Sequence, residues 1–394
     1  MQTATLPLQK GYRIQSIDLL RGLVMIIMAL DHTRDFFHWS AQHYDPLDFS
    51  KTSAPIFLTR WITHYCAPVF VFLAGTGAWL TGNRKGKKYL SKFLITRGLW
   101  LIFLEIVVVN FGVSFNIYFN FFMLQTIWAL GLSMMVLSFL IYIPKRILLG
   151  LALLIIVGHN SLDKIHVEGN GFEAFLWSAL HDPKFFKWGN VTVFLLYPVL
   201  SWIGVMAAGY CFGEIYTRFD AARRKTILTW LGLLCISLFI IIRFTNVYGD
   251  ASAWSTQATP VFTFLSFINV TKYPPSLLYI LMTIGPAILF LAFTEKPLNK
   301  FGNIISIYGK VPMFYYLIHF YVLHIAAITA GLLTGFSLQK MLTFTPDNPL
   351  LDFGFKLSVV YLVWISVVAL LYFPCRWYAK YKFSHPEKWW LSYL

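Results

Sequence analysis

Ionisable side chains stand inside two long apolar stretches between residues 16 and 80. Charged groups at membrane depth are energetically costly, so we interpret them as functional. A histidine exchanges protons at neutral pH, and carboxylates and guanidinium groups balance charge beside it, a combination that suits general acid–base chemistry. The ionisable residues in these stretches that we single out are Asp18, Arg21, Asp31, His32, Arg60 and His64.

In the first stretch, polar and methionine residues recur every three or four positions. Residues with this spacing share one face of a helix. On this helix Arg21 and His32 lie roughly 16 Å apart along the axis, near opposite membrane boundaries. Two other interpretations stay open, headgroup binding for Arg21 and an interhelical hydrogen bond for His32. Consecutive helical residues diverge, so we expect Asp31 to pair with another helix. The shared face consists of Asp18, Arg21, Met25, Met28, His32 and Asp35.

The second stretch carries Arg60 and His64 four residues apart, which predicts that they share a helix face at the level of His32. Pro68 is expected to kink this helix. Gly75 and Gly77 would let another helix approach closely.

The short segment between the two stretches adds further polar residues, among them His38, His43, Asp45 and Asp48. Metal binding is an alternative role for these residues, but the segment lacks the ligand spacing of zinc sites, so we expect no metal. Proton transfer by a histidine fits this set of residues better. Later in the chain, Tyr315 and His319 could line a cavity or join helices by hydrogen bonds.

The composition places these elements in a membrane. Hydrophobic residues make up 58% of the 394 residues and charged residues 12%, about half the charged share of soluble domains. Continuous apolar runs of about twenty residues predict an all-α, polytopic integral membrane protein rather than a barrel. The formal charge of +15 does not indicate nucleic-acid binding, because the basic residues occupy short connections between apolar runs.

Ten membrane spans are predicted within one domain, residues 1–394. Dense Lys and Arg clusters, beginning with Lys10 and Arg13, fall on one side when ten spans are counted, so both termini are predicted to be cytoplasmic. The outer segments 161–190 and 245–275 form either a structured cap or solvated connections. The predicted spans are 17–37, 57–81, 93–113, 119–143, 146–160, 191–216, 226–244, 276–294, 311–334 and 355–374.

Two sequence runs carry a family resemblance. SIDLLRGLVMIIMALDH and TRWITHYCAPVFVFLAGTGAWL resemble the catalytic domain of the heparan-alpha-glucosaminide N-acetyltransferase family, in particular its bacterial branch, most specifically over residues 13–80. The spacing of Arg21 and His32 also resembles that of integral-membrane acyltransferases that O-acetylate bacterial surface glycans.

The resemblance implies transfer of an acetyl group from cytoplasmic acetyl-CoA to a sugar hydroxyl or amine of an extracytoplasmic glycan. The family's active-site histidine corresponds to His43, whereas the glycan O-acyltransferases have theirs at the position of His32, so both remain candidates for the base. Asp31, His64 and Arg60 complete the predicted catalytic set. The residues predicted to bind acetyl-CoA are Arg21, Asp18, Arg84, Lys85 and Arg97.

Other interpretations remain beside direct acetyl transfer. The transfer could pass through an acetyl-histidine. Buried Arg, Asp and His residues also suit a proton-coupled transporter of a small solute, and a structural membrane partner is a third alternative. The expected location is the bacterial inner membrane. The expected partners are an acyl-CoA, a glycan acceptor, the lipid bilayer and a second copy of the chain as a homodimer, but no nucleic acid.

Overall fold

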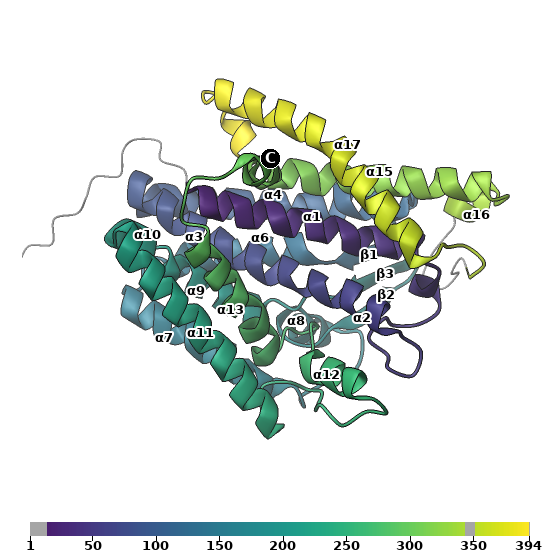
Figure 1. The fold of residues 1–394 in the computed structure, drawn as a ribbon, viewed down its shortest axis with the longest axis horizontal. Coiled ribbons are helices and arrows are strands. Elements are labelled where there is room, and N and C mark those ends of the chain that lie inside the picture. Colours follow the sequence, from purple (N-terminus) through teal and green to yellow (C-terminus); the bar gives the residue numbers. More distant parts are fainter. Residues whose placement is uncertain (1–13, 343–350, 394) are drawn as a thin grey trace, which may run out of the picture.

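The computed structural model describes residues 14–342 and 351–393, and these form an α-helical bundle (Figure 1). Every predicted span corresponds to a helix or to a group of consecutive helices. The basic residues Lys10 and Arg13, which entered the topology count, lie outside the described residues. The helices that correspond to the spans are α1 (Gln15–Phe37), α2 and α3 (Ala54–Trp61 and Cys66–Lys85), α4 and α5 (Lys87–Phe103 and Asn110–Ser114), α6 (Thr126–Leu140), α7 (Lys145–Gly158), α9 (Leu200–Phe212), α11 (Ala221–Thr245), α13 (Leu277–Phe293), α15 (Pro312–Leu333) and α17 (Leu357–Ser384).

Six helical stretches among the described residues are long and apolar enough to cross a membrane. They contain α2–α3, α4–α5, α7, α11, α15 and α17. Helices α6 and α13 are apolar but shorter. Helix α1 has the length of a span but carries the charged residues Asp18, Arg21, Asp31, Arg34 and Asp35. The protein is thus an all-α polytopic membrane protein in which one central helix is unusually charged.

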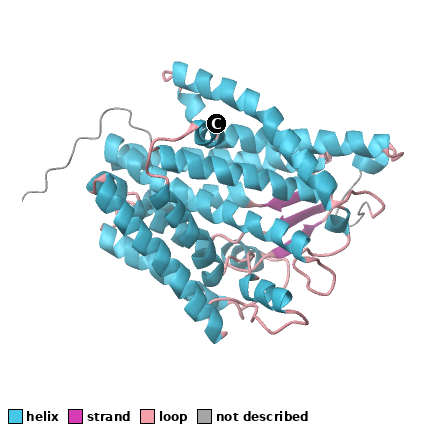
Figure 2. Cartoon of the chain, viewed as in Figure 1, coloured by secondary structure: helices cyan, strands magenta, loops and turns pink. Residues whose placement is uncertain are grey.

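A small three-stranded sheet and short helices cover one end of the bundle (Figure 2). Strand β3 pairs in parallel with β1 and antiparallel with β2. The outer segments therefore form a structured cap rather than solvated connections. The cap and the remaining connections contain β1 (Phe121–Leu124), β2 (Lys184–Trp188), β3 (Val191–Leu195), α8 (Phe172–Leu180), α10 (Ile215–Arg218), α12 (Pro260–Ile268), α14 (Lys300–Lys310), α16 (Leu338–Leu342) and the 3₁₀ turns η1 (Trp39–Gln42), η2 (Ile62–Tyr65), η4 (His159–Leu162) and η5 (Trp389–Ser392).

The strands correct two predicted span boundaries. Predicted span 119–143 begins two residues before β1 and includes it, and predicted span 191–216 begins with β3. Their helices are Thr126–Leu140 and Leu200–Phe212. Both segments start with aromatic and β-branched residues, which are apolar enough to extend a predicted span but favour a strand.

Segments predicted to be cytoplasmic contact one another at the end of the bundle that holds α10, opposite the sheet (Figure 1). Lys145 at the start of α7 forms an ion pair with Glu214, and Arg224 at the start of α11 pairs with Glu295 at 2.6 Å. At the other end, Asn160 accepts a hydrogen bond from the backbone of Leu277, which begins α13. The predicted alternation of inner and outer connections agrees with this arrangement.

Helix α1 packs closely against α14 through glycines. A β-carbon on Gly309 would lie 1.9 Å from the Asp18 carbonyl oxygen, and one on Gly22 would lie 2.1 Å from that of Ile305. Helix α3 packs similarly on α9, because a β-carbon on Gly75 would lie 2.1 Å from the Met206 carbonyl oxygen. The prediction of close approach is therefore confirmed at Gly75.

At Gly77 the prediction of close helix approach is wrong, since a β-carbon there would meet no atom within 4 Å. This residue instead lines the cavity described below.

Substitution Gly309→Ala should separate α1 from α14. We expect it to lower the free energy of unfolding by about 1–3 kcal/mol, the usual cost of inserting a methyl group into a packed interior. Thermal unfolding of the detergent-solubilised protein measures this loss. Gly150→Ala is the matched control, because a β-carbon at this exposed helical position meets nothing within 4 Å. Equal melting temperatures for the two variants would contradict the prediction.

Candidate functional site

A cavity of about 650 Å³ follows one face of α1. Its volume is within the usual range of ligand-binding cavities, about 300–1,000 Å³. Side chains from α3, α4, α6 and α15 form much of the remaining wall. The helix face predicted from the spacing is confirmed, except that Asp18 is absent from the lining. The residues of that face that line the cavity are Arg21, Met25, Met28, His32 and Asp35.

The inner part of the cavity wall carries several cationic side chains. Arg21 donates a hydrogen bond to the Gly309 carbonyl oxygen at 3.3 Å and lies 3.4 Å from the Asp18 carboxylate. Arg84 is held through a hydrogen bond to the Leu80 carbonyl oxygen. Arg21 and Arg97 lie near the predicted cytoplasmic ends of spans 17–37 and 93–113. The cations of this part of the wall are Arg21, Arg84, Arg97, Lys310 and Lys382.

Two residues predicted to bind the acyl donor lie elsewhere. Lys85 is exposed and donates a hydrogen bond to the Tyr89 hydroxyl at 3.0 Å. Asp18 is buried where α1 meets α14. In the other direction, sequence reasoning missed Lys310 and Lys382, because a lysine at the end of an apolar run resembles any other cytoplasmic anchor.

A buried ion cluster forms the outer part of the wall. The Asp31 carboxylate accepts two hydrogen bonds from Arg60 Nη1, at 2.7 and 2.9 Å. Arg34 Nη2 lies 3.1 Å from Asp31, and Lys272 Nζ lies 4.0 Å from it. The prediction that Asp31 pairs with another helix is confirmed. Three cations and the two carboxylates of Asp31 and Asp35 leave one positive charge in excess.

Tyr273 adds a phenol to this cluster. Its hydroxyl lies 3.4 Å from Arg60 Nη2, and its ring contacts that of Tyr197 with centroids 5.1 Å apart. Burial opposes ionisation of Tyr273, but the positive charges of Lys272 and Arg60 outweigh it and hold the pKa of the phenol below its usual value. Tyr273 is also among the residues that line the cavity. Sequence reasoning overlooked Lys272 and Tyr273, which lie in a loop far along the chain.

His32 lines the cavity next to this cluster. Its ring packs against Phe320 and His319, with centroids 4.4 and 5.2 Å away, and its Nδ1 lies 3.8 Å from an Asp35 carboxylate oxygen. His319 is fully buried and donates from Nδ1 to the Tyr316 carbonyl oxygen at 2.6 Å. Because that bond occupies Nδ1 as a donor, Nε2 of the neutral His319 ring is left as a hydrogen-bond acceptor.

His43 and His64 lie away from the cavity wall. His43 is exposed, and its Nδ1 lies 2.7 Å from the Trp39 carbonyl oxygen. His64 is fully buried with its ring against Tyr279, and it is not among the residues that line the cavity.

The prediction that Arg60 and His64 share a helix face is wrong. Helix α2 ends at Trp61, and residues 62–65 form the tighter 3₁₀ turn η2. At about 120° per residue, this turn places His64 roughly 100° away from Arg60 around the axis.

A comparison with protein families matches residues 13–243 to the family described as heparan-alpha-glucosaminide N-acetyltransferase, catalytic. This match covers more than half of the 394 residues. The chain belongs to this family. A search of curated proteins finds no match.

The protein is therefore a member of a transmembrane acetyltransferase family, the heparan-alpha-glucosaminide N-acetyltransferases. The matched region runs from just before α1 into α11 and includes the cavity residues Arg21, His32, Arg60 and Arg97. The loop that supplies Lys272 lies beyond it.

Substitution Asp31→Asn should destabilise the outer end of the bundle, because Arg34, Lys272 and the partly buried Arg60 would lose their common anion. We expect the free energy of unfolding to fall by about 3–5 kcal/mol, as when one partner of a buried ion pair is removed. Chemical denaturation in detergent measures it. Glu168→Gln, at an exposed loop position, serves as the control. Stability unchanged by Asp31→Asn would contradict the structural role of the cluster.

Proposed function

We propose that this protein transfers an acetyl group from cytoplasmic acetyl-CoA, through the bilayer, to a sugar hydroxyl or amine at the outer face. The observation that carries the proposal is that one cavity has cations in its inner wall and an ion cluster with His32 in its outer wall. By this proposal the protein resides in the bacterial inner membrane.

The inner cations suit the phosphates of coenzyme A. Arginine binds phosphate oxygens through paired, charge-assisted hydrogen bonds. Arg21, Arg84 and Arg97 would hold the nucleotide part of the donor, with Lys310 and Lys382 adding positive charge. The acyl arm would then extend along the face of α1. Met25 and Met28 offer apolar, adaptable surface between the two ends.

The chemical step would take place at the outer end. His32 accepts the proton of the acceptor hydroxyl or amine as its oxygen or nitrogen attacks the thioester carbonyl carbon. The new bond forms, the carbon–sulfur bond breaks, and the proton passes from His32 to the departing thiolate. Arg60, Lys272 and Tyr273 would stabilise the negative charge that develops on the carbonyl oxygen.

The acceptor class follows from the family's description, which names a glucosaminide. An amino sugar presents a nucleophilic nitrogen, and neutral sugars present hydroxyl groups that the same base would activate. We therefore propose glucosamine-containing glycans as the first acceptors to test.

Acetyl-CoA should bind the purified protein, and its affinity should fall when the inner cations are neutralised. Loss of one charged hydrogen bond costs about 1.5–3 kcal/mol, so Arg21→Gln and Arg84→Gln should each lower the affinity roughly 10- to 150-fold. Isothermal titration calorimetry measures the affinity, with free acetate as the reference ligand. Arg223→Gln, an exposed arginine that is not among the lining residues, should leave the affinity unchanged.

If the titration shows no binding heat specific to the CoA ester, the acetyltransferase proposal is excluded. The proton-coupled transporter would then be favoured as the alternative function.

A turnover assay should distinguish which of the two candidate histidines is the base. His32→Gln should slow the release of free CoA thiol about 10²- to 10⁴-fold, the usual contribution of a general base, while acetyl-CoA still binds. His43→Gln should keep a rate near that of the unsubstituted protein. The assay uses acetyl-CoA with glucosamine as the acceptor in proteoliposomes. The reverse pattern, with only His43→Gln inactive, would transfer the base role to His43.

A further inference from the structure

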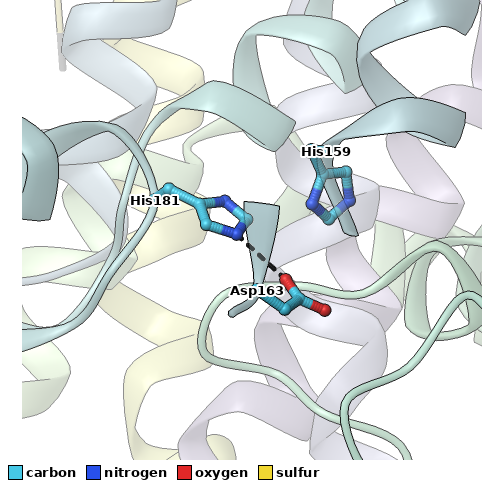
Figure 3. A group of neighbouring side chains, drawn as sticks. All are labelled: His159, Asp163 and His181. Atoms are coloured by element: carbon cyan, nitrogen blue, oxygen red, sulfur yellow. Dashed lines mark hydrogen bonds and ion pairs between the residues drawn. The ribbon is translucent and has the colours of Figure 1, made fainter. Parts of the chain in front are cut away.

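Three potential metal ligands meet in the outer cap, away from the cavity. His159 directly follows α7 as the first residue of η4, and Asp163 comes four residues later. His181 comes from the segment that follows α8. One ligand atom from each residue lies within 4.8 Å of the others. Figure 3 shows the two imidazole rings and the carboxylate facing one another across a small space.

The buried imidazoles leave nitrogen atoms without hydrogen-bond partners. Both residues are 2% exposed, and both ring nitrogens of His159 and Nδ1 of His181 make no hydrogen bond. The remaining nitrogen of His181, Nε2, lies 2.9 Å from the Asp163 carboxylate. Buried polar atoms are almost always satisfied in proteins, and each exception needs an explanation, such as an ion.

We propose that His159, Asp163 and His181 bind a zinc ion, with a water molecule as the fourth ligand. Two neutral imidazoles and one carboxylate are ligands that zinc accepts in tetrahedral sites. Zinc–nitrogen bonds of about 2.0–2.1 Å place neighbouring ligand atoms roughly 3.4 Å apart. The two most widely separated ligand atoms must therefore approach each other by at most about 1.4 Å, the difference between 4.8 Å and that separation. Side-chain rotation can supply this movement.

Neighbouring groups already orient the carboxylate. Asn160 Nδ2 donates to one Asp163 oxygen at 2.8 Å, while the other oxygen faces His181. The amide oxygen of Asn160 accepts from the backbone nitrogen of Leu277, the first residue of α13, at 2.8 Å. Such supporting hydrogen bonds are typical of metal sites.

The ion would act as a structural clamp. It would tie the end of α7 to the segment after α8, and through Asn160 to the start of α13. Lys272, in the outer wall of the cavity, comes shortly before α13. The clamp is independent of acetyl transfer, because none of its ligands lines the cavity.

The prediction of no metal rests on the ligand spacing in the first outer loop. This cluster lies elsewhere, and it joins two residues four apart with a third from another segment. The separation of four residues between His159 and Asp163 is the signal that the sequence offered.

Zinc binding can be measured without any enzymatic assay. The full chain is purified with a histidine-free affinity tag, stripped with a chelator, and incubated with Zn²⁺ alone. After desalting, elemental analysis should find one zinc per chain, and Zn²⁺ should raise the melting temperature. Asp163→Asn and His181→Ala should lose the retained zinc and the thermal shift.

The matched control is His166→Ala in the same outer segment. His166 is 60% exposed and pairs with Asp182, so its removal should leave zinc binding intact. Equal zinc retention by the ligand variants and the unsubstituted protein would overturn the proposal, as would loss in the control.

A second measurement needs no variant. Co²⁺ bound to the stripped, unsubstituted protein should show the intense visible absorption bands of a tetrahedral site. Their absence would also overturn the proposal.

Discussion

The buried carboxylate of Asp31 is the interaction on which the outer end of the bundle depends. Arg60 from α2, Arg34 from α1 and Lys272 from the loop before α13 all converge on it. Without this anion the three cations would repel one another, and Asp35 would remain as an ion-pair partner for Arg34. A single carboxylate thus fixes the positions of three segments that are far apart in the sequence.

Helix α1 transmits this constraint to the other end of the cavity. Gly22 and Gly309 allow its inner half to lie directly on α14, while Asp31 anchors its outer half. A helix rises by a constant amount per residue, so the separation of Arg21 and His32 is set by the covalent chain. The length of the cavity therefore depends on one rigid element rather than on loops.

The sequence predicted those features that depend on the spacing of residues within one helix. Helical periodicity predicted the face of α1 that lines the cavity and the need of Asp31 for a partner on another helix. It failed at His64, because the 3₁₀ turn that rotates this side chain depends on packing around η2. Lys272 and Tyr273 were beyond prediction for another reason. Their role depends on a contact with Asp31 and Arg60 across more than two hundred residues.

The geometry also bears on the choice between the two candidate bases. Under the proposed function, the thioester arrives along the face of α1, guided by phosphate binding near Arg21. A base on the same helix stays at a fixed distance from the bound donor. Such pre-positioning accounts for much of catalytic efficiency. His43 is exposed beyond the 3₁₀ turn η1 and would have to move to reach that path. His32 lines the cavity from that helix and needs no such movement.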